Sequence, residues 1–513
     1  MVERVLVLGG GTAGLLTASA LKKKIPQLGV TVLRSNDPGV IELGEGTRPD
    51  FRELVHRYLG IGLPEFYRGA APTPMLGIRF LWGPRPSFNL TFGSNVLHQP
   101  DGLSRPLGFY CDEDMDDLCA SSSLMSACRA FPQADDGSLV IVEDMAYHVD
   151  HRRLIPFLES YATRLGVELR DETIRQVERD EQGVAGLVAA SGVTYEADLY
   201  VDSSGFRSLL LGQALDEPLV SYQATLFCDR AVIGSWERSR SEPIRPYTTA
   251  ETMNAGWCWQ FEHEHSLARG YVYASDFLTD EEAEQEFRAK APRVEASRLV
   301  KFAPGRRRNA WVKNVVGVGS AVGFVEPLEA TALMVISQDA RLLTEILLDT
   351  RLNPGQAARV YSMKSAVSWD AIRDFLALHY RFNTRLDTPF WLACRADIDL
   401  CGAAELVSYY QEEGPNSWGA NILPPTHTWL GFTADSSYTL LLGQRVPYRK
   451  TYQPSDDELR ELASIRLENR ALALNAFEPS RALQVFRDPR FAPAPTPGPG
   501  PAVGPDPSRS PGA

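Results

Sequence analysis

Residues 4–14 of this 513-residue chain read RVLVLGGGTAG. The apolar run at 5–8 is typical of a parallel strand that is buried on both faces. The pattern that follows places Gly9, Gly11 and Gly14 at the start of a predicted helix. These glycines suit a tight turn, close approach of a diphosphate to the backbone, and close packing of helix on strand. The stretch therefore predicts a Rossmann-like dinucleotide-binding unit.

The second predicted strand covers 30–33 and leads into Arg34 and Ser35. An acidic residue usually occupies this place and binds the ribose hydroxyls of the nucleotide. Arg34 would instead suit a 2'-phosphate, which would indicate NADP. We favour a flavin, because a nicotinamide dehydrogenase has no need of two later glycine-containing segments, 201–205 and 317–319.

Those two segments resemble the strand-end loops that close on the ribityl chain and ring of FAD in two-domain flavoproteins. Asp202 could accept hydrogen bonds from ribityl hydroxyls, and the glycines allow backbone contact. No second GxGxxG pattern opens another βαβ unit. We therefore expect FAD as the cofactor, supplied as FADH2 by a separate flavin reductase or reduced by transiently bound NAD(P)H.

Composition excludes several classes of partner. A formal net charge of -13 argues against a surface that tracks nucleic-acid phosphates. Seven cysteines form no CxxC pair, and their odd number without a signal peptide indicates reduced thiols rather than zinc sites or disulfides. No apolar run approaches the roughly 18 residues that span a bilayer. We expect a soluble, cytoplasmic protein with no metal, nucleic-acid or membrane partner.

The expected fold class is α/β, a two-domain flavoprotein. A Rossmann-like FAD-binding box with mixed sheets would occupy 1–345, with inserted sheet segments at about 75–145 and 215–300. Helical periodicity then predicts a mainly helical substrate cap over 346–490. The Pro- and Gly-rich stretch 491–513 is expected to be a disordered tail, because it has too little apolar surface to bury.

Seven short motifs resemble the flavin-dependent tryptophan halogenases, in that family's order and across about residues 4–395. They lie at 9–14, 44–47, 197–207, 256–259, 270–277, 324–331 and 387–391. The resemblance implies a flavin-binding box with a helical cap that holds the substrate. It is also compatible with a homodimer.

In that family, reduced FAD captures O2 as a C4a-hydroperoxide, and a halide bound beside the flavin attacks it to give hypohalous acid. The oxidant then moves through a tunnel to the substrate, where a lysine and a glutamate direct it. The resemblance thus implies FAD used as FADH2 with O2, a halide if the chemistry is halogenation, and a small aromatic substrate that is free or tethered to a carrier.

Carried over one residue at a time, the family's glutamate falls on Glu329, a candidate acid or base that could also be a simple helix N-terminal carboxylate. The halide-binding Thr-Gly pair falls on Thr331 and Ala332, and the intervening serine is Ala330. Alanine tolerates fewer backbone conformations than glycine if the turn at Ala332 needs a positive φ.

The family's catalytic lysine is replaced. Alignment on the segment 77–80 places Met75 at its position, and the chain contains no lysine between Lys24 and Lys290. A thioether cannot protonate or donate a hydrogen bond as an ammonium does, and it is readily oxidised to a sulfoxide. Lysine-dependent halogenation is therefore in doubt.

The motif thought to keep substrate away from the flavin is also altered. Trp257 and Trp259 are retained, but the usual Ile-Pro that follows becomes Phe261-Glu262. Loss of the proline is expected to loosen this segment, which would favour direct oxidation or hydroxylation at the flavin.

The candidate catalytic residues are thus Glu329, Met75, Trp257 and Trp259. The expected FAD contacts are Gly9, Gly11, Thr12, Ala13, Gly14, Arg34, Ser35, Gly46, Thr47, Ile174, Asp202, Gly319, Ser320, Pro327 and Leu333.

Three functions remain open on these residues. The first is an oxygen-activating monooxygenase or oxidase that acts on an aromatic, indole-like intermediate of secondary metabolism. The second is a true halogenase that uses Glu329 without the usual lysine. The third is a flavin-binding scaffold without turnover.

Overall fold

A computed structural model describes most of the chain. It covers residues 2–35, 43–93, 96–112, 114–239, 241–349, 351–425, 427, 430–488 and 490–491. The predicted disordered tail lies outside these residues from position 492 onward.

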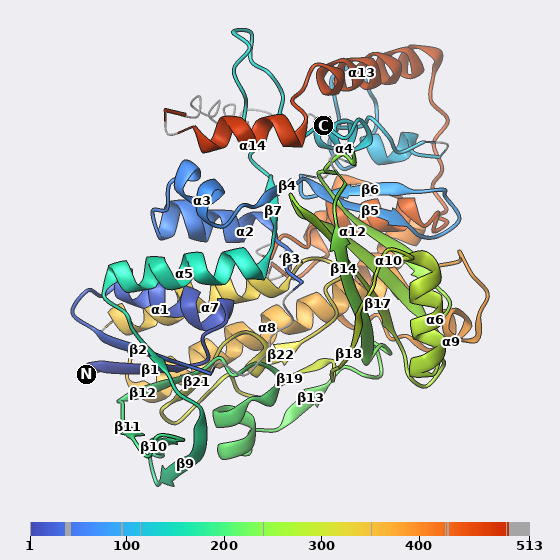
Figure 1. Cartoon of the computed structure of the whole chain (residues 1–513). Coiled ribbons are helices and arrows are strands. Elements are labelled where there is room, and N and C mark those ends of the chain that lie inside the picture. Colours follow the sequence, from blue (N-terminus) through green and yellow to red (C-terminus); the bar gives the residue numbers. More distant parts are fainter. Residues whose placement is uncertain are drawn as a thin grey trace, which may run out of the picture.

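The predicted Rossmann-like unit forms the left side of the molecule in Figure 1. Its six-stranded sheet has the order β20-β21-β12-β1-β2-β8. The strands are β1 (Arg4–Leu8), β2 (Gly29–Arg34), β8 (Glu168–Asp171), β12 (Leu199–Asp202), β20 (Trp311–Val312) and β21 (Val315–Gly317). All neighbours pair in parallel except β20 with β21. The buried apolar runs of β1 and β12 fit this central position.

Three helices lie together over this sheet (Figure 1). They are α1 (Thr12–Lys24), α5 (His151–Leu165) and α7 (Ala332–Leu348). Helix α1 follows β1 directly and buries nine of its thirteen residues. Helix α7 arrives from far along the chain and packs beside α1. Both helices therefore belong to the predicted Rossmann-like unit.

A second, seven-stranded sheet joins two distant parts of the sequence. Its order is β18-β14-β17-β16-β15-β5-β6. The strands are β5 (Gly77–Leu81), β6 (Phe88–Thr91), β14 (Arg230–Glu237), β15 (Thr248–Met253), β16 (Gly256–Glu262), β17 (Ser266–Tyr273) and β18 (Ser297–Lys301). The connection is the parallel pairing of β5 with β15.

Three small sheets complete the strands. The first, β3-β7-β4, lies between the two large sheets, and the others are β11-β10-β9 and β13-β19-β22. Their bounds are β3 (Glu45–Gly46), β4 (Thr73–Met75), β7 (Ala146–Val149), β9 (Ile174–Asp180), β10 (Gly183–Ala189), β11 (Thr194–Tyr195), β13 (Leu219–Ser221), β19 (Gly305–Arg307) and β22 (Gly323–Phe324).

The remaining helices lie mostly in the second half of the chain. They are α2 (Pro49–Arg52), α3 (Leu63–Gly69), α4 (Ala120–Ser126), α6 (Asp280–Lys290), α8 (Pro354–Arg381), α9 (Pro389–Asp397), α10 (Ala404–Glu413), α12 (Ala434–Gly443), α13 (Asp456–Leu474) and α14 (Pro479–Arg487). Helices α13 and α14 return to the first half and cover α4 and α3 (Figure 1). In the described part of the chain, no helix combines the length and apolar character needed to cross a membrane. The predicted mixed α/β fold is confirmed.

Candidate active site and cofactor cradle

The glycine turn after β1 is as tight as the sequence predicts. The Gly9 amide donates to the Leu33 carbonyl at 2.8 Å, and Gly9 has a φ of +125°. A Cβ on Gly14 would lie 2.0 Å from the Gly9 carbonyl oxygen. By contrast, a Cβ on Gly11 would meet no heavy atom of the described chain within 4 Å. The turn is therefore closed on its strand side and open at Gly11.

The open side of this turn fits a diphosphate. Gly11 is the N-cap of α1 and supplies no side-chain cap, so the first backbone amides of the helix remain for a ligand. Thr12 and Ala13 begin this helix. The Ala13 side chain faces the loop that contains Gly319, because a Cβ on Gly319 would lie 3.2 Å from the Ala13 Cβ.

Arg34 is neutralised by the protein itself. Its Nε lies 2.6 Å from an oxygen of Asp171, and a second ion pair joins it to Glu159. The hydrogen bonds to Asp171 and then Glu159 raise the pKa of Arg34. Two carboxylates repel a 2'-phosphate, which argues against the NADP alternative. Ser35 contacts the hydroxyl of Thr173 at 3.1 Å, next to the first residue of β9, Ile174.

Asp202 has a different role from the predicted one. Its side chain is fully buried, and its Oδ2 accepts hydrogen bonds from the Leu210 and Leu211 amides, each at 2.8 Å. Its Oδ1 accepts from the amide and hydroxyl of Ser204. A carboxylate has about four acceptor sites. The chain therefore fills the sites that were expected to receive ribityl hydroxyls, and Asp202 holds the loop in place.

The loop after β21 depends on a buried carboxyl group of α7. Gly319 has a φ of +61°. Burial raises the pKa of Asp339 to about 8, although the backbone amide of Gly319 is near enough to favour the charged form of that carboxyl, which lowers its pKa. Asp339 is therefore a protonated acid below that pH, and it lies near Gly319, an expected FAD contact.

Asp339→Asn is expected to flatten the pH dependence of stability. In the folded state this carboxyl keeps its proton up to a pH of about 8, whereas the unfolded chain loses it near the ordinary value of 3.8. Wild-type stability should therefore fall as pH rises through this window, by up to about 1.4 kcal/mol per pH unit. Denaturant unfolding at several pH values between 5 and 8 measures the slope.

Asp349→Asn is the matched control, because Asp349 follows the same helix and its side chain is 30% exposed. Its hydrogen bonds to Arg351 lower its pKa to about 2, so it does not titrate between pH 5 and 8. An unchanged slope in Asp339→Asn would contradict the assignment.

The carboxylate of Glu329 is buried and shares a proton with a histidine. Glu329 is 1% exposed, and its Oε1 lies 2.8 Å from Nε2 of the fully buried His379. His379 Nδ1 lies 3.1 Å from the Phe375 carbonyl oxygen, which can only accept, so Nδ1 carries a hydrogen. The pair is therefore either a carboxylate with an imidazolium or a carboxylic acid with a neutral imidazole. Both forms can move a proton.

A buried arginine completes this cluster. Arg48 is 6% exposed, and its Nη1 lies 3.6 Å from Glu329 Oε2. Its guanidinium carbon lies 5.3 Å and 5.0 Å from the ring centres of Phe92 and Phe432. Burial lowers the pKa of Arg48, and Glu329 opposes that shift. We call Arg48, Glu329 and His379 the buried triad.

Sequence patterns did not identify two members of the buried triad. Arg48 follows the 44–47 motif directly, and a basic residue at that place was the available signal. His379 interrupts an apolar helix stretch, 375–380, where a histidine is usually a packing residue. Only the fold brings both side chains to Glu329.

The strained backbone position near Glu329 is Ala330, not Ala332. Ala330 has a φ of +56°, whereas Ala332 is the first residue of α7 and Thr331 is its N-cap. Alanine in place of glycine at 332 therefore meets ordinary helical geometry. Leu333 follows within the first turn and is fully buried. Pro327 accepts a hydrogen bond from the Ala330 amide at 3.3 Å.

Ala330→Gly and Ala332→Gly should change stability in opposite directions. Glycine at 330 removes left-handed strain and is expected to add about 0.5–1 kcal/mol to the free energy of unfolding. Glycine at 332 loosens a helix start and should lower it by up to about 1 kcal/mol. Denaturant unfolding of both variants tests this, and a loss of stability in Ala330→Gly would be the contrary result.

Met75 packs against the loop that precedes Arg48. It is fully buried in β4, and the Thr248 hydroxyl lies 3.7 Å from its sulfur. A Cβ on Gly46 would lie 2.9 Å from the same sulfur. Thr47 is buried as well and accepts a hydrogen bond from the Tyr147 amide at 2.9 Å. The expected lysine position thus adjoins the strand that leads to Arg48.

The tryptophan motif is firmly held. Its strand, β16, pairs with β15 on one side and β17 on the other. Trp257 is fully buried, and Trp259 is 4% exposed and stacks on Phe261 with ring centres 4.2 Å apart.

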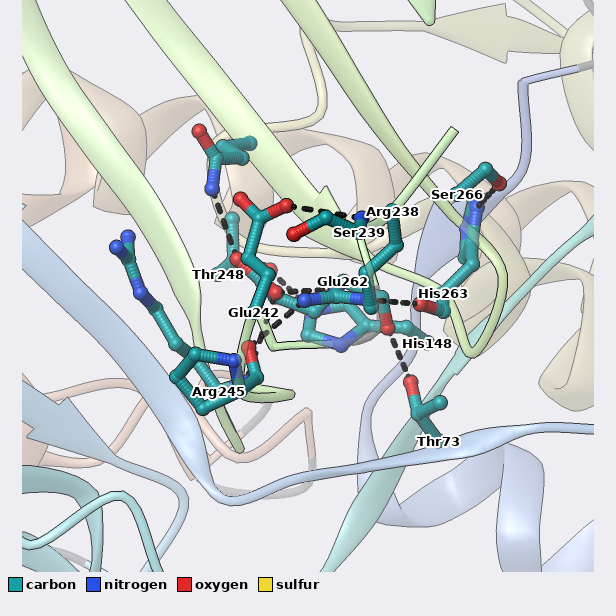
Figure 2. A network of polar contacts seen from close by, with 12 residues as sticks. Thr73, His148, Arg238, Ser239, Glu242, Arg245, Thr248, Glu262, His263 and Ser266 are labelled. Atoms are coloured by element: carbon teal, nitrogen blue, oxygen red, sulfur yellow. Dashed lines mark hydrogen bonds and ion pairs between the residues drawn. The ribbon is translucent and has the colours of Figure 1, made fainter. Parts of the chain in front are cut away.

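Glu262, which replaces the expected proline, is fixed by an ion pair (Figure 2). Its Oε2 lies 2.5 Å from Nη2 of Arg238, and the two side chains are 1% and 5% exposed. Arg238 also donates to the His263 carbonyl at 3.0 Å, and Gln260 donates to Glu262 Oε1 at 2.8 Å. The expectation of a loosened segment is therefore wrong, because a buried charge pair anchors the end of β16.

Comparisons with known proteins agree with this architecture. The chain matches the tryptophan halogenase family model over residues 4–459. It is 32% identical over 437 residues to tryptophan 7-halogenase RebH of Lentzea aerocolonigenes, covering 80% of this chain and 82% of that protein. It is also 32% identical over 421 residues to tryptophan 6-halogenase ThaL of Streptomyces albogriseolus, covering 76% and 78% of the two chains.

Solved structures give the same result. The crystal structure of MibH, a lanthipeptide tryptophan 5-halogenase, superposes with a TM-score of 0.86 at 37% identity and covers 95% of this chain and 93% of that one. Tryptophan 6-halogenase SttH of Streptomyces toxytricini superposes with a TM-score of 0.84 at 29% identity, covering 94% and 99%.

Proposed function

Because the chain belongs to the flavin-dependent tryptophan halogenase family, we propose that it halogenates an electron-rich aromatic, indole-like substrate. The observation that carries this proposal is the buried triad. It keeps a carboxylate, a proton-sharing imidazole and a cation together in apolar surroundings, as electrophilic substitution requires.

FAD fits the glycine turn described above. The open face at Gly11 and the first amides of α1 would hold its diphosphate, with Gly319 and Thr47 on neighbouring loops. When reduced and bound there, it would supply with O2 the oxidising power that converts halide to hypohalous acid. The α7 N-terminus, at the buried Thr331 and the half-buried Ala332, offers backbone amides for the halide.

Glu329 is the proposed general base. Electrophilic attack on an aromatic carbon leaves one proton too many on that carbon, and a buried carboxylate can remove it. His379 holds Glu329 Oε1 and leaves Oε2 for this task, since Oε2 has no hydrogen-bond partner in the described part of the chain.

Hydroxylation is the second candidate, and Met75 is the observation that favours it. A thioether at the family's lysine position offers no charge to receive an oxidant from the flavin side. Against it, the ion pair at Glu262 fixes the tryptophan motif instead of opening it.

The test combines the purified protein with FAD, a flavin reductase, NADH, O2 and bromide, and offers free tryptophan, a tryptophan-containing peptide and simple indoles. Brominated product that requires bromide supports the proposal. Hydroxylated product that forms without halide would reject it in favour of the second candidate. Tight FAD binding, with reoxidation no faster than that of free reduced flavin, would indicate a scaffold.

A further inference from the structure

Arg48 is a buried cation that uses little of its hydrogen-bonding capacity among the residues that the structure describes. A guanidinium carries five N–H donors. Nη2 donates to the Gly431 carbonyl at 3.1 Å, while Nε has no hydrogen-bond partner among the described residues. Nη1 stops 3.6 Å from Glu329 Oε2, which is itself without a hydrogen bond in this part of the structure. A donor and an acceptor thus face each other across a short gap.

Arg85, a second buried arginine of this protein, has a purely structural role and differs from Arg48 in its hydrogen bonds. Arg85 has the same 6% exposure as Arg48. Its guanidinium donates to three backbone carbonyls, those of Leu442, Cys111 and Asp112. Unsatisfied buried donors cost stability, so they persist where a ligand or a reaction uses them.

We propose that Arg48 is the catalytic cation that receives the oxidant in place of the missing lysine. This inference rests on the proposed function. The facing donor and acceptor suit a small molecule that both accepts and donates a hydrogen bond, and hypohalous acid is such a molecule. Arg48 Nη1 would donate to its oxygen, and Glu329 Oε2 would accept its hydrogen.

The position of Arg48 accounts for the loss of the lysine. Met75 packs against Gly46, and Arg48 follows two residues later in extended backbone, with φ −107° and ψ 168°. Side chains two apart in an extended segment emerge on one face. A cation on this segment, next to the β4 position that Met75 occupies, can therefore pair with Glu329 in place of the lysine.

The proposed step conserves atoms and electrons. The aromatic carbon forms its bond to the halogen as the oxygen–halogen bond of hypohalous acid breaks, and the departing hydroxide carries the bonding electron pair. Arg48 stabilises the developing negative charge on that oxygen. Glu329 takes the proton from the substituted ring carbon and passes it to the hydroxide, which leaves as water. The aromatic C–H and hypohalous acid become halogenated arene and water.

The variant Arg48→Met tests whether Arg48 acts when hypohalous acid reacts with the substrate or when hypohalous acid is formed. We expect halogenation of the aromatic substrate to fall by about 100-fold. Free hypohalous acid, trapped with monochlorodimedone, should form at the wild-type rate, because Arg48 acts after the halide is oxidised. The thermal midpoint should fall by less than it does in Arg85→Met, because His379 remains beside Glu329 when Arg48 is removed. Arg85→Met, the matched control, should lower the thermal midpoint and leave the ratio of halogenated product to oxidant unchanged.

Arg48→Lys is the second variant. It keeps the charge but loses the planar fork, and we expect substrate halogenation to fall by about tenfold with oxidant formation unchanged. Substrate halogenation within threefold of wild type in either variant would overturn the inference. So would an equal loss of oxidant and product, which would place Arg48 at the flavin step. A wild type that gives no halogenated product at all would reject the proposed function first, and this inference with it.

Discussion

Arg238→Met is expected to lower the free energy of unfolding by about 3–5 kcal/mol. The substitution leaves the carboxylate of Glu262 1% exposed and without its cation. Uncompensated buried charge is among the most costly defects in a protein interior. Arg238 also holds the Pro243 and His263 carbonyls, at 2.7 Å and 3.0 Å, so these acceptors lose a donor as well. Denaturant unfolding at pH 7 gives the difference.

The double variant Arg238→Met/Glu262→Met is the decisive comparison. It removes both charges, and we expect it to recover most of the stability that the single variant loses. The pair Arg288–Glu284 provides a control, since both side chains are more than 40% exposed. Arg288→Met should change stability by less than about 1 kcal/mol. A double variant as unstable as Arg238→Met would show that the charge pair is not the cause.

Glu329→Gln is expected to reduce halogenated product by about 10²–10⁴-fold. Glutamine keeps the size of the side chain and a carbonyl oxygen beside His379, but it cannot take a proton from the ring carbon. Oxidant formation should continue, so monochlorodimedone should still be halogenated. Steady-state product formation at saturating substrate, together with the oxidant trap, separates the two steps.

Glu326→Gln is the control for this loss, because Glu326 lies in the same segment and is fully buried. Burial raises its pKa to about 7. Product within a few-fold of wild type would show that the effect belongs to Glu329. If Glu329→Gln itself kept most of its activity, another group would have to be the base.

The parts of this protein that could be predicted are those whose structure is determined by residues adjacent in the sequence. The run from Arg4 to Gly14 contains its own strand, turn and helix start, so local pattern was enough to predict the cofactor turn. Glu329 was identified by the resemblance of its segment to a known family. The later strands were recognised as sheet, but their pairing partners were not, because pairing such as β5 with β15 joins residues about 170 positions apart.

The rest of the site could not be predicted because it arises from long-range contacts. The role of Arg48 follows from its contacts with Glu329, Phe432 and Gly431, and only the fold brings these residues together. The sequence indicated only the loss of a proline at Glu262, because its cation, Arg238, is 24 residues away in sequence and follows another strand, β14. The positive φ likewise lies at Ala330 and not at Ala332. Residue types alone do not predict which of the two alanines adopts this strained conformation.

The strand order of the cofactor sheet has a consequence for synthesis of the chain. β1 is translated first, but its neighbour β12 ends at residue 202 and the next strand, β21, begins at residue 315. Helix α7, which supports the Gly319 loop, follows later still. Non-local pairing delays assembly. A nascent chain therefore carries an incomplete cofactor sheet and glycine turn until α7, which ends at Leu348, has left the ribosome.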